Sequence, residues 1–92
     1  MAIVVKYDLR GMAAVKYDGI IRELAQIGQG APDGRKYHVS YGDREQIQVI
    51  DIFESPAHLE AFGAKLMPIL AKFGVEAVPD VLGETHNIIV GR

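Results

Sequence analysis

The chain begins with a regular alternation of apolar and polar side chains. Over residues 2–9 every odd position is apolar, whereas Lys6 and Asp8 are charged. This period of two predicts a half-buried strand. Over residues 12–27 the apolar positions recur at spacings of three and four, which predicts an amphipathic helix. The glycines that follow, together with Pro32, predict a loop over residues 28–35.

The middle of the chain reads as two strands joined by a short polar turn. Residues 35–42 alternate again, the segment GDREQ follows, and residues 47–54 are rich in β-branched side chains. This succession predicts a β-hairpin. If the turn places Gly42 opposite Ile47, antiparallel pairing brings His38 opposite Asp51.

A second helix is predicted after the hairpin. Ser55 and Pro56 provide an N-cap and a first-turn proline, and Gly74 provides the end. Pro68 lies inside this helix and predicts a kink or break near Met67.

The end of the chain is predicted to hold a connector and a last short strand. Residues 75–83 contain Pro79 and Gly83, which favour the connector. The segment HNIIVG, residues 86–91, is predicted as the strand.

The predicted order of elements, βαββαβ, defines the expected fold. Right-handed crossovers place both helices on the same face of the sheet. We therefore expect an α+β, ferredoxin-like domain over residues 1–92, with an antiparallel four-stranded sheet and two helices on one face. The strand at residues 47–54 is apolar on both sides, so its open face must also be covered. A second copy of the chain could cover it, which predicts a homodimer closed into a dimeric α/β barrel.

Composition excludes several classes of partner. The chain has 92 residues, 49% of them hydrophobic and 24% charged, with a net charge of −2. The basic residues are scattered, which predicts no nucleic-acid partner. No apolar run approaches the roughly 20 residues of a membrane span, and the N-terminal run lacks the features of a signal peptide, so no membrane partner is expected. The absence of cysteine excludes disulfides and thiol catalysis and favours a cytoplasmic location.

A carboxylate within an apolar strand is the main sign of chemistry. Asp51 interrupts an otherwise apolar run, and its predicted neighbour His38 could act as a general base that Asp51 orients. His86 or Asn87, at the predicted last strand, could stabilise an oxyanion. The alternative for His38 and Asp51 is a buried hydrogen-bonded pair that only fixes the strand register.

Aromatic residues could line a pocket for a small hydrophobic or aromatic ligand, although core packing is their commoner use. The candidate substrate-binding residues are Tyr7, Tyr17, Tyr41 and Phe62. His38, His58 and His86 have no metal-binding spacing, so no metal is predicted. No cofactor is predicted, because the glycine-rich segment GQGAPDG follows a helix and does not open one.

Several segments resemble a known family. The run VIDIFES, the helix PAHLEAFGAKLMPILAKFG and the segment HNIIV are similar to those of dimeric α/β barrel proteins of the antibiotic biosynthesis monooxygenase type. The resemblance implies the ferredoxin-like fold and a homodimer. It also implies an activity among cofactor-independent oxygenases, haem-degrading enzymes or small isomerases.

Two functions therefore stay open. The first is a cofactor-independent monooxygenase or isomerase that acts on a small aromatic or enolisable compound. The second is a non-catalytic, small-ligand-binding or stress-associated dimeric barrel protein. The absence of tryptophan, of a nucleophile constellation and of a cofactor motif favours the second.

Overall fold

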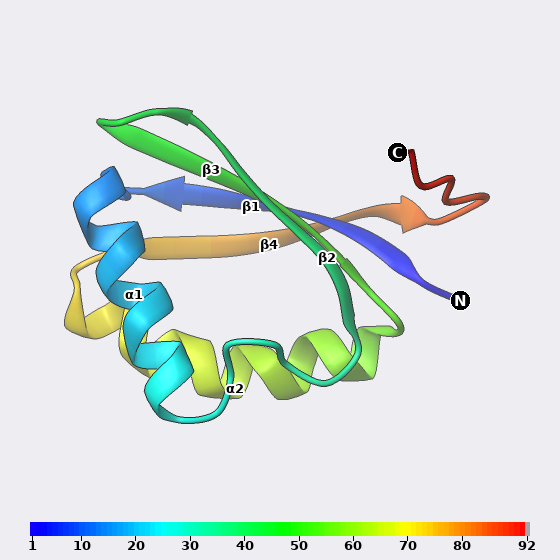
Figure 1. Cartoon of the computed structure of the whole chain (residues 1–92), viewed down its shortest axis with the longest axis horizontal. Coiled ribbons are helices and arrows are strands. Elements are labelled where there is room, and N and C mark those ends of the chain that lie inside the picture. The colour runs from blue at the N-terminus through cyan, green and yellow to red at the C-terminus, as the bar shows by residue number, and fades with distance from the viewer. Residues whose placement is uncertain (92) are drawn as a thin grey trace.

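The chain folds into one antiparallel sheet with both helices packed on the same face (Figure 1). The computed structural model describes residues 1–91. The strands lie in the order β2-β3-β1-β4, which confirms the predicted ferredoxin-like topology. In chain order the elements are β1 (Ile3–Arg10), α1 (Ala14–Gln26), β2 (Arg35–Asp43), β3 (Gln46–Phe53), α2 (Pro56–Lys72) and β4 (Glu76–Glu84).

The hairpin between β2 and β3 has the predicted register. Gly42 lies opposite Ile47, and His38 lies opposite Asp51. The carboxylate of Asp43 accepts hydrogen bonds from the backbone N–H groups of Glu45 and Gln46, at 2.9 and 3.0 Å. This local turn fixes the pairing, because an aspartate that binds its own following backbone favours a tight turn.

Helix α2 begins and ends where the capping residues predict. The Ser55 hydroxyl accepts a hydrogen bond from the backbone N–H of His58 at 3.3 Å. At the other end Gly74 has a φ of 69°, the left-handed conformation that favours glycine after a helix. Of the predicted kink or break near Met67, the break is wrong, because α2 runs continuously through Pro68. Pro68 lies on the exposed side of the helix, where water can bind the carbonyl that loses its intrahelical partner.

The predicted last strand is also wrong. The fourth strand is β4, at residues 76–84, and residues 86–91 have no regular structure. The proline and glycine of β4 are tolerated because β4 is an edge strand, where Pro79 lies opposite Tyr7, and because the pairing shifts at Val4 and Val5 on β1. The strand ladder continues only to Thr85, whose backbone N–H donates to the carbonyl of Ala2 at 2.8 Å.

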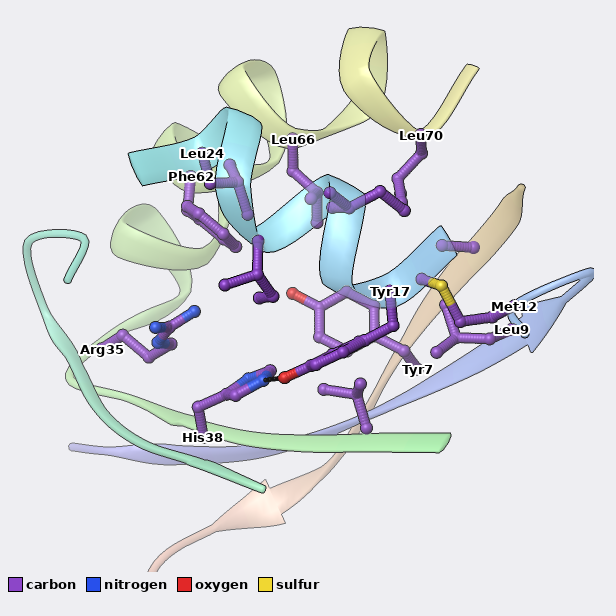
Figure 2. Close-up of a pocket in the computed structure, with 14 residues that line it drawn as sticks. Tyr7, Leu9, Met12, Tyr17, Leu24, Arg35, His38, Phe62, Leu66 and Leu70 are labelled. Atoms are coloured by element: carbon purple, nitrogen blue, oxygen red, sulfur yellow. Dashed lines mark hydrogen bonds between the residues drawn. The ribbon is translucent and has the colours of Figure 1, made fainter. Parts of the chain in front are cut away.

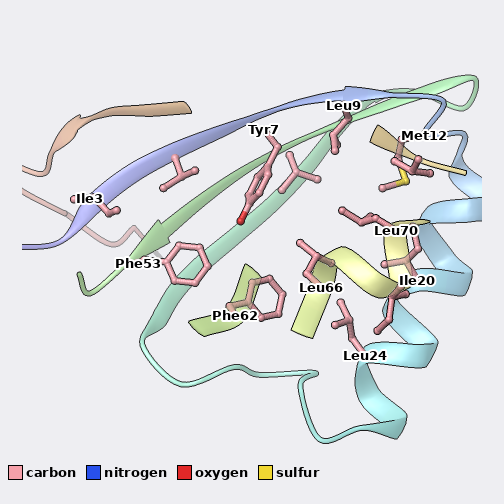
Figure 3. Close-up of a cluster of buried hydrophobic side chains, with 14 residues drawn as sticks. Ile3, Tyr7, Leu9, Met12, Ile20, Leu24, Phe53, Phe62, Leu66 and Leu70 are labelled. Carbon is pink, nitrogen blue, oxygen red and sulfur yellow. The ribbon is translucent and has the colours of Figure 1, made fainter. Parts of the chain in front are cut away.

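The core lies between the sheet and the two helices (Figure 3). Strand β1 sends its odd-numbered side chains into it, as its alternation predicts. Gly19 on α1 allows close packing of the two helices, because a Cβ at this position would lie 2.7 Å from the Phe73 ring. No helix within residues 1–91 is long and apolar enough to cross a membrane.

The opposite face of the sheet carries no element of the described chain (Figure 1). It presents a group of apolar side chains that are half-buried or exposed, among them Val39, which is 54% exposed. This group, which we call the open-face cluster, consists of Tyr37, Val39 and Tyr41 from β2 and Ile50 and Ile52 from β3.

Candidate functional site

The carboxylate of Asp51 lies under the helices. Strand β3 alternates so that Val49, Asp51 and Phe53 face the core, and Asp51 is only 2% exposed. It is the one buried charged residue among those that the structure describes. A buried charge is strongly unfavourable unless it is paired, so the residue that pairs with Asp51 determines the chemistry of the site.

His38 is that partner. Its Nδ1 lies 2.5 Å from Oδ1 of Asp51, which makes a short hydrogen bond between neighbouring strands. An ionised carboxylate can only accept, so we assign the proton to Nδ1 of the imidazole. The other ring nitrogen, Nε2, is then an acceptor when the ring is neutral.

The hydroxyl of Tyr17 occupies this acceptor. It lies 2.6 Å from Nε2 of His38, and the two rings are nearly parallel, with 9° between their planes. With Nε2 as acceptor, the Tyr17 hydroxyl is the donor. A hydrogen-bonded series therefore runs from Tyr17 on α1, through His38 on β2, to Asp51 on β3.

This series borders a largely apolar pocket between the sheet and the helices (Figure 2). The cavity within the pocket has a volume of about 40 Å³ and is partly open to solvent. Small-molecule sites commonly have about 300–1,000 Å³, so this cavity has room for water-sized molecules, and a larger ligand enters only if the lining side chains move apart. Its apolar lining includes Leu9, Met12, Leu66 and Leu70, and its polar lining includes Tyr7, Tyr17, Arg35 and His38.

Tyr7 directs a buried hydroxyl to this pocket. The residue is 3% exposed, and within the described chain its hydroxyl has no hydrogen-bond partner. Burial raises the pKa of this hydroxyl, the negative charge of Asp51 raises it further, and the positive charge of Arg35 acts in the opposite direction. Tyr7 is therefore a neutral phenol at ordinary pH, able both to donate and to accept.

Arg35 also lines the pocket, although the sequence pattern did not single it out. A simple alternation along β2 would place Arg35 and His38 on opposite faces. The pairing is irregular between Arg35 and Tyr37, so that Arg35 lies opposite Phe53 and His38 opposite Asp51. This bulge turns Arg35 to the core face. No signal in the sequence locates such a bulge.

Of the other candidates, only Phe62 reaches the pocket. Tyr41 belongs to the open-face cluster, because β2 alternates and His38 occupies the other face. His86 and Asn87 follow the end of β4, are exposed, and do not line the pocket. The structure thus corrects the predicted placement of these three residues, and the misassigned last strand explains it for His86 and Asn87.

Within residues 1–91, no group of three histidine, aspartate or glutamate side chains comes close enough together to hold a metal ion. His58, for example, is engaged at the start of α2, where its Nδ1 lies 2.7 Å from the Ser55 hydroxyl.

The fold and the position of the pocket define a ferredoxin-like domain with a small apolar pocket between sheet and helices. Two solved structures share this fold. The chain is similar to SnoaB, a cofactor-independent oxygenase from Streptomyces nogalater, with a TM-score of 0.59, 12% sequence identity, and coverage of 95% of this chain and 94% of that one.

It is also similar to a protein from Deinococcus radiodurans described as a candidate antibiotic biosynthesis monooxygenase. The TM-score is 0.55, the identity is 16%, and the match covers 98% of this chain and all of the other. No protein-family model matches the sequence, and no curated relative matches it either. The similarity confirms the fold of the antibiotic biosynthesis monooxygenase type.

Proposed function

We propose that this chain is a cofactor-independent oxygenase or isomerase that acts on a small aromatic or enolisable compound. The observation that carries the proposal is the hydrogen-bonded series from Tyr17 through His38 to Asp51, which borders an apolar pocket. Such a series can move a proton in surroundings that suit a flat hydrophobic compound.

The proton would pass through Tyr17. Because its hydroxyl occupies Nε2 of His38, Tyr17 donates its own proton to Nε2 while it accepts one from an acidic C–H or O–H group of the substrate. The carboxylate of Asp51 stabilises the imidazolium that results. Proton transfer to a positioned base typically contributes about 10²–10⁴ in rate, which suffices for a substrate that is already acidic.

The deprotonated substrate is rich in electrons and can react with dioxygen itself. In an anthrone, the CH₂ carbon loses both hydrogens and gains one oxygen atom, and the second oxygen atom leaves as water. Dioxygen is then both the oxidant and the oxygen source. In an isomerisation the same proton returns to another carbon. The similarity to SnoaB, a cofactor-independent oxygenase, supports the oxygenase.

Oxygen uptake with anthrone and with hydroquinone tests the proposal. The wild type should consume oxygen and form the quinone, and His38→Ala and Tyr17→Phe should both lose most of this rate. His86→Ala is the matched control, because His86 is an exposed histidine outside the pocket. Full activity in His38→Ala, or no turnover of either compound by the wild type, would contradict the assignment.

Non-catalytic binding of a small ligand, as in a stress-associated dimeric barrel protein, is the second candidate. It is favoured by one observation: both ring nitrogens of His38 are already engaged in hydrogen bonds. NMR titration of the histidines against pH, with and without ligand, separates the two functions. A His38 ring that shifts with ligand in a protein that consumes no oxygen would support this second function.

The proposal includes a homodimer in which two copies pack through their open faces. The open-face cluster supports it, since an apolar sheet face of this kind is stable only when it is covered. A domain of this size also has a small core of its own and gains stability from a partner.

A further inference from the structure

The cavity between the sheet and the helices is small and apolar (Figure 2). Its volume is about 40 Å³, and its surface is almost wholly apolar. A cavity needs roughly 10–15 Å³ to hold one water-sized molecule, whereas a cavity of about 150 Å³ holds benzene. The cavity therefore has room for a molecule of two or three heavy atoms but not for an aromatic ring.

Water is poorly suited to this cavity, because a buried water needs about two to four polar partners. The Tyr17 hydroxyl and Nε2 of His38 already bind each other, and Nδ1 of His38 binds Asp51. The Tyr7 hydroxyl is fully buried and does not reach the cavity surface. An apolar molecule loses no hydrogen bonds when it leaves water for such a surface, and it gains dispersion contacts with the lining side chains.

The cavity also lies beside the hydrogen-bonded series. Tyr17 and His38 are half-buried, and both line the cavity. A molecule inside it therefore lies against the two side chains that would take the proton from the substrate. Because the cavity is partly open to solvent, a small molecule can enter and leave it.

We infer that this cavity is a binding site for dioxygen. Dioxygen is diatomic and apolar, so it suits both the volume and the surface of the cavity. The site holds it next to Tyr17 and His38, where the deprotonated substrate would react with it. This inference rests on the proposed function, because it assigns a place to the oxidant of that reaction. It adds that the inner part of the pocket serves dioxygen and not the aromatic compound.

NMR relaxation of side-chain methyl groups under dioxygen pressure, with nitrogen pressure as the reference, tests the inference on the wild type. Dioxygen is paramagnetic and accelerates the relaxation of nearby nuclei, with an effect that falls steeply with distance. Ile20 lines the cavity, and its methyl groups should show a several-fold larger enhancement than those of Ile3. The two residues are matched, because both are buried isoleucines, 2% and 3% exposed, and Ile3 does not line the cavity. Equal enhancement at Ile20 and Ile3 overturns the inference.

Filling the cavity from Ala77 tests its location. Ala77 has the smallest side chain of the lining residues and lies on β4. Ala77→Leu should remove most of the excess enhancement at Ile20. Ala71→Leu, at an exposed position of α2 outside the cavity, is the matched control and should leave the excess unchanged. An excess that survives in Ala77→Leu overturns the inference. If Ala77→Leu does not fold, Val49→Ile adds a single methyl group to the same lining and should reduce the excess.

Oxygen uptake with anthrone connects the cavity to the reaction. Ala77→Leu should raise the KM for dioxygen several-fold and leave the KM for anthrone near that of the wild type. A raised KM for anthrone with an unchanged KM for dioxygen would show that the cavity holds the aromatic compound, and it would overturn the inference. Excess enhancement at Ile20 without oxygen uptake by the wild type leaves the dioxygen site standing and rejects the oxygenase. Oxygen uptake with equal enhancement at Ile20 and Ile3 does the reverse.

Discussion

Removing one oxygen atom from Tyr7 should stabilise the ligand-free protein. The hydroxyl is buried without a partner within the described chain, and the ring beneath it is part of the core. An unsatisfied buried hydroxyl costs about 1–3 kcal/mol, whereas the phenylalanine ring retains the same packing. Part of this gain is offset by the small void that the oxygen leaves. We therefore expect Tyr7→Phe to raise the free energy of unfolding by about 1 kcal/mol, which corresponds to about 4–8 °C in melting temperature for a domain of this size.

Urea and thermal unfolding followed by circular dichroism measure this change. Wild type and variant must be compared at one protein concentration, because association alters the apparent stability. Ser40→Ala is the control, since it removes a hydroxyl from an exposed residue of β2 that lies outside both the pocket and the open-face cluster. A loss of about 1 kcal/mol or more in Tyr7→Phe would show that the hydroxyl has a partner in the free protein, such as a fixed water. The conclusion that this buried hydroxyl is unsatisfied would then be refuted.

Wild type and Tyr7→Phe should also differ in how their stability changes at alkaline pH. Burial first, and then the charge of Asp51, raises the pKa of the Tyr7 hydroxyl above its ordinary value of 10.0, while Arg35 opposes the change. Above pH 10 the unfolded chain therefore loses this proton and the folded chain keeps it. The unfolded state then binds fewer protons, so the stability of the wild type falls as the pH rises. The slope from this group reaches about 1.4 kcal/mol per pH unit, and Tyr7→Phe lacks it. The advantage of the variant should thus grow above pH 10, and a constant difference would contradict the assigned burial.

Three further changes test the site, the second helix and the open face. Asp51→Asn keeps the shape of the side chain but removes the charge that stabilises the His38 imidazolium, so oxygen uptake should fall by about 100-fold or more. A rate above half of wild type would contradict proton transfer through the hydrogen-bonded series. Pro68→Ala restores an intrahelical hydrogen bond in the continuous helix α2 and should raise the free energy of unfolding by up to about 3 kcal/mol in urea titrations. A loss of stability would show that the helix needs the proline. Val39→Asp places a charge in the open-face cluster and should convert the dimer to monomer in analytical ultracentrifugation at micromolar concentration, whereas a monomeric wild type would refute the dimer.

The parts of the fold that local chemistry determines could be predicted from the sequence. The cap at Ser55, the helix end at Gly74 and the turn at Asp43 each depend on residues within four positions of one another. The hairpin register follows from that turn, and with it the contact between His38 and Asp51. This contact could therefore be predicted, although its two residues lie 13 positions apart.

The last strand could not be predicted, because its environment is set by tertiary structure. Pro79 and Gly83 disfavour a strand interior, but β4 lies at the edge of the sheet and pairs only with β1. An edge position tolerates a proline whose nitrogen faces away from the neighbouring strand. The apolar segment at residues 86–91 has a better strand pattern and yet no strand partner within the described chain. The hydrophobic pattern shows which segments could form a strand. Which of them does so depends on which strand edges of the sheet are still unpaired.

The same distinction explains which site residues the sequence reveals. Asp51 can be recognised as a site residue from the sequence, because a carboxylate in an apolar strand is strongly unfavourable unless another side chain pairs with it. Its presence alone therefore indicates a partner. Tyr7 and Tyr17 give no such signal, because a tyrosine ring suits a core whether or not its hydroxyl is used. Arg35 is hidden for another reason: one bulge in β2 reverses the face to which it points. A buried charge can thus be located from sequence, whereas the positions of the other pocket-lining residues, such as Tyr7, Tyr17 and Arg35, depend on packing and register.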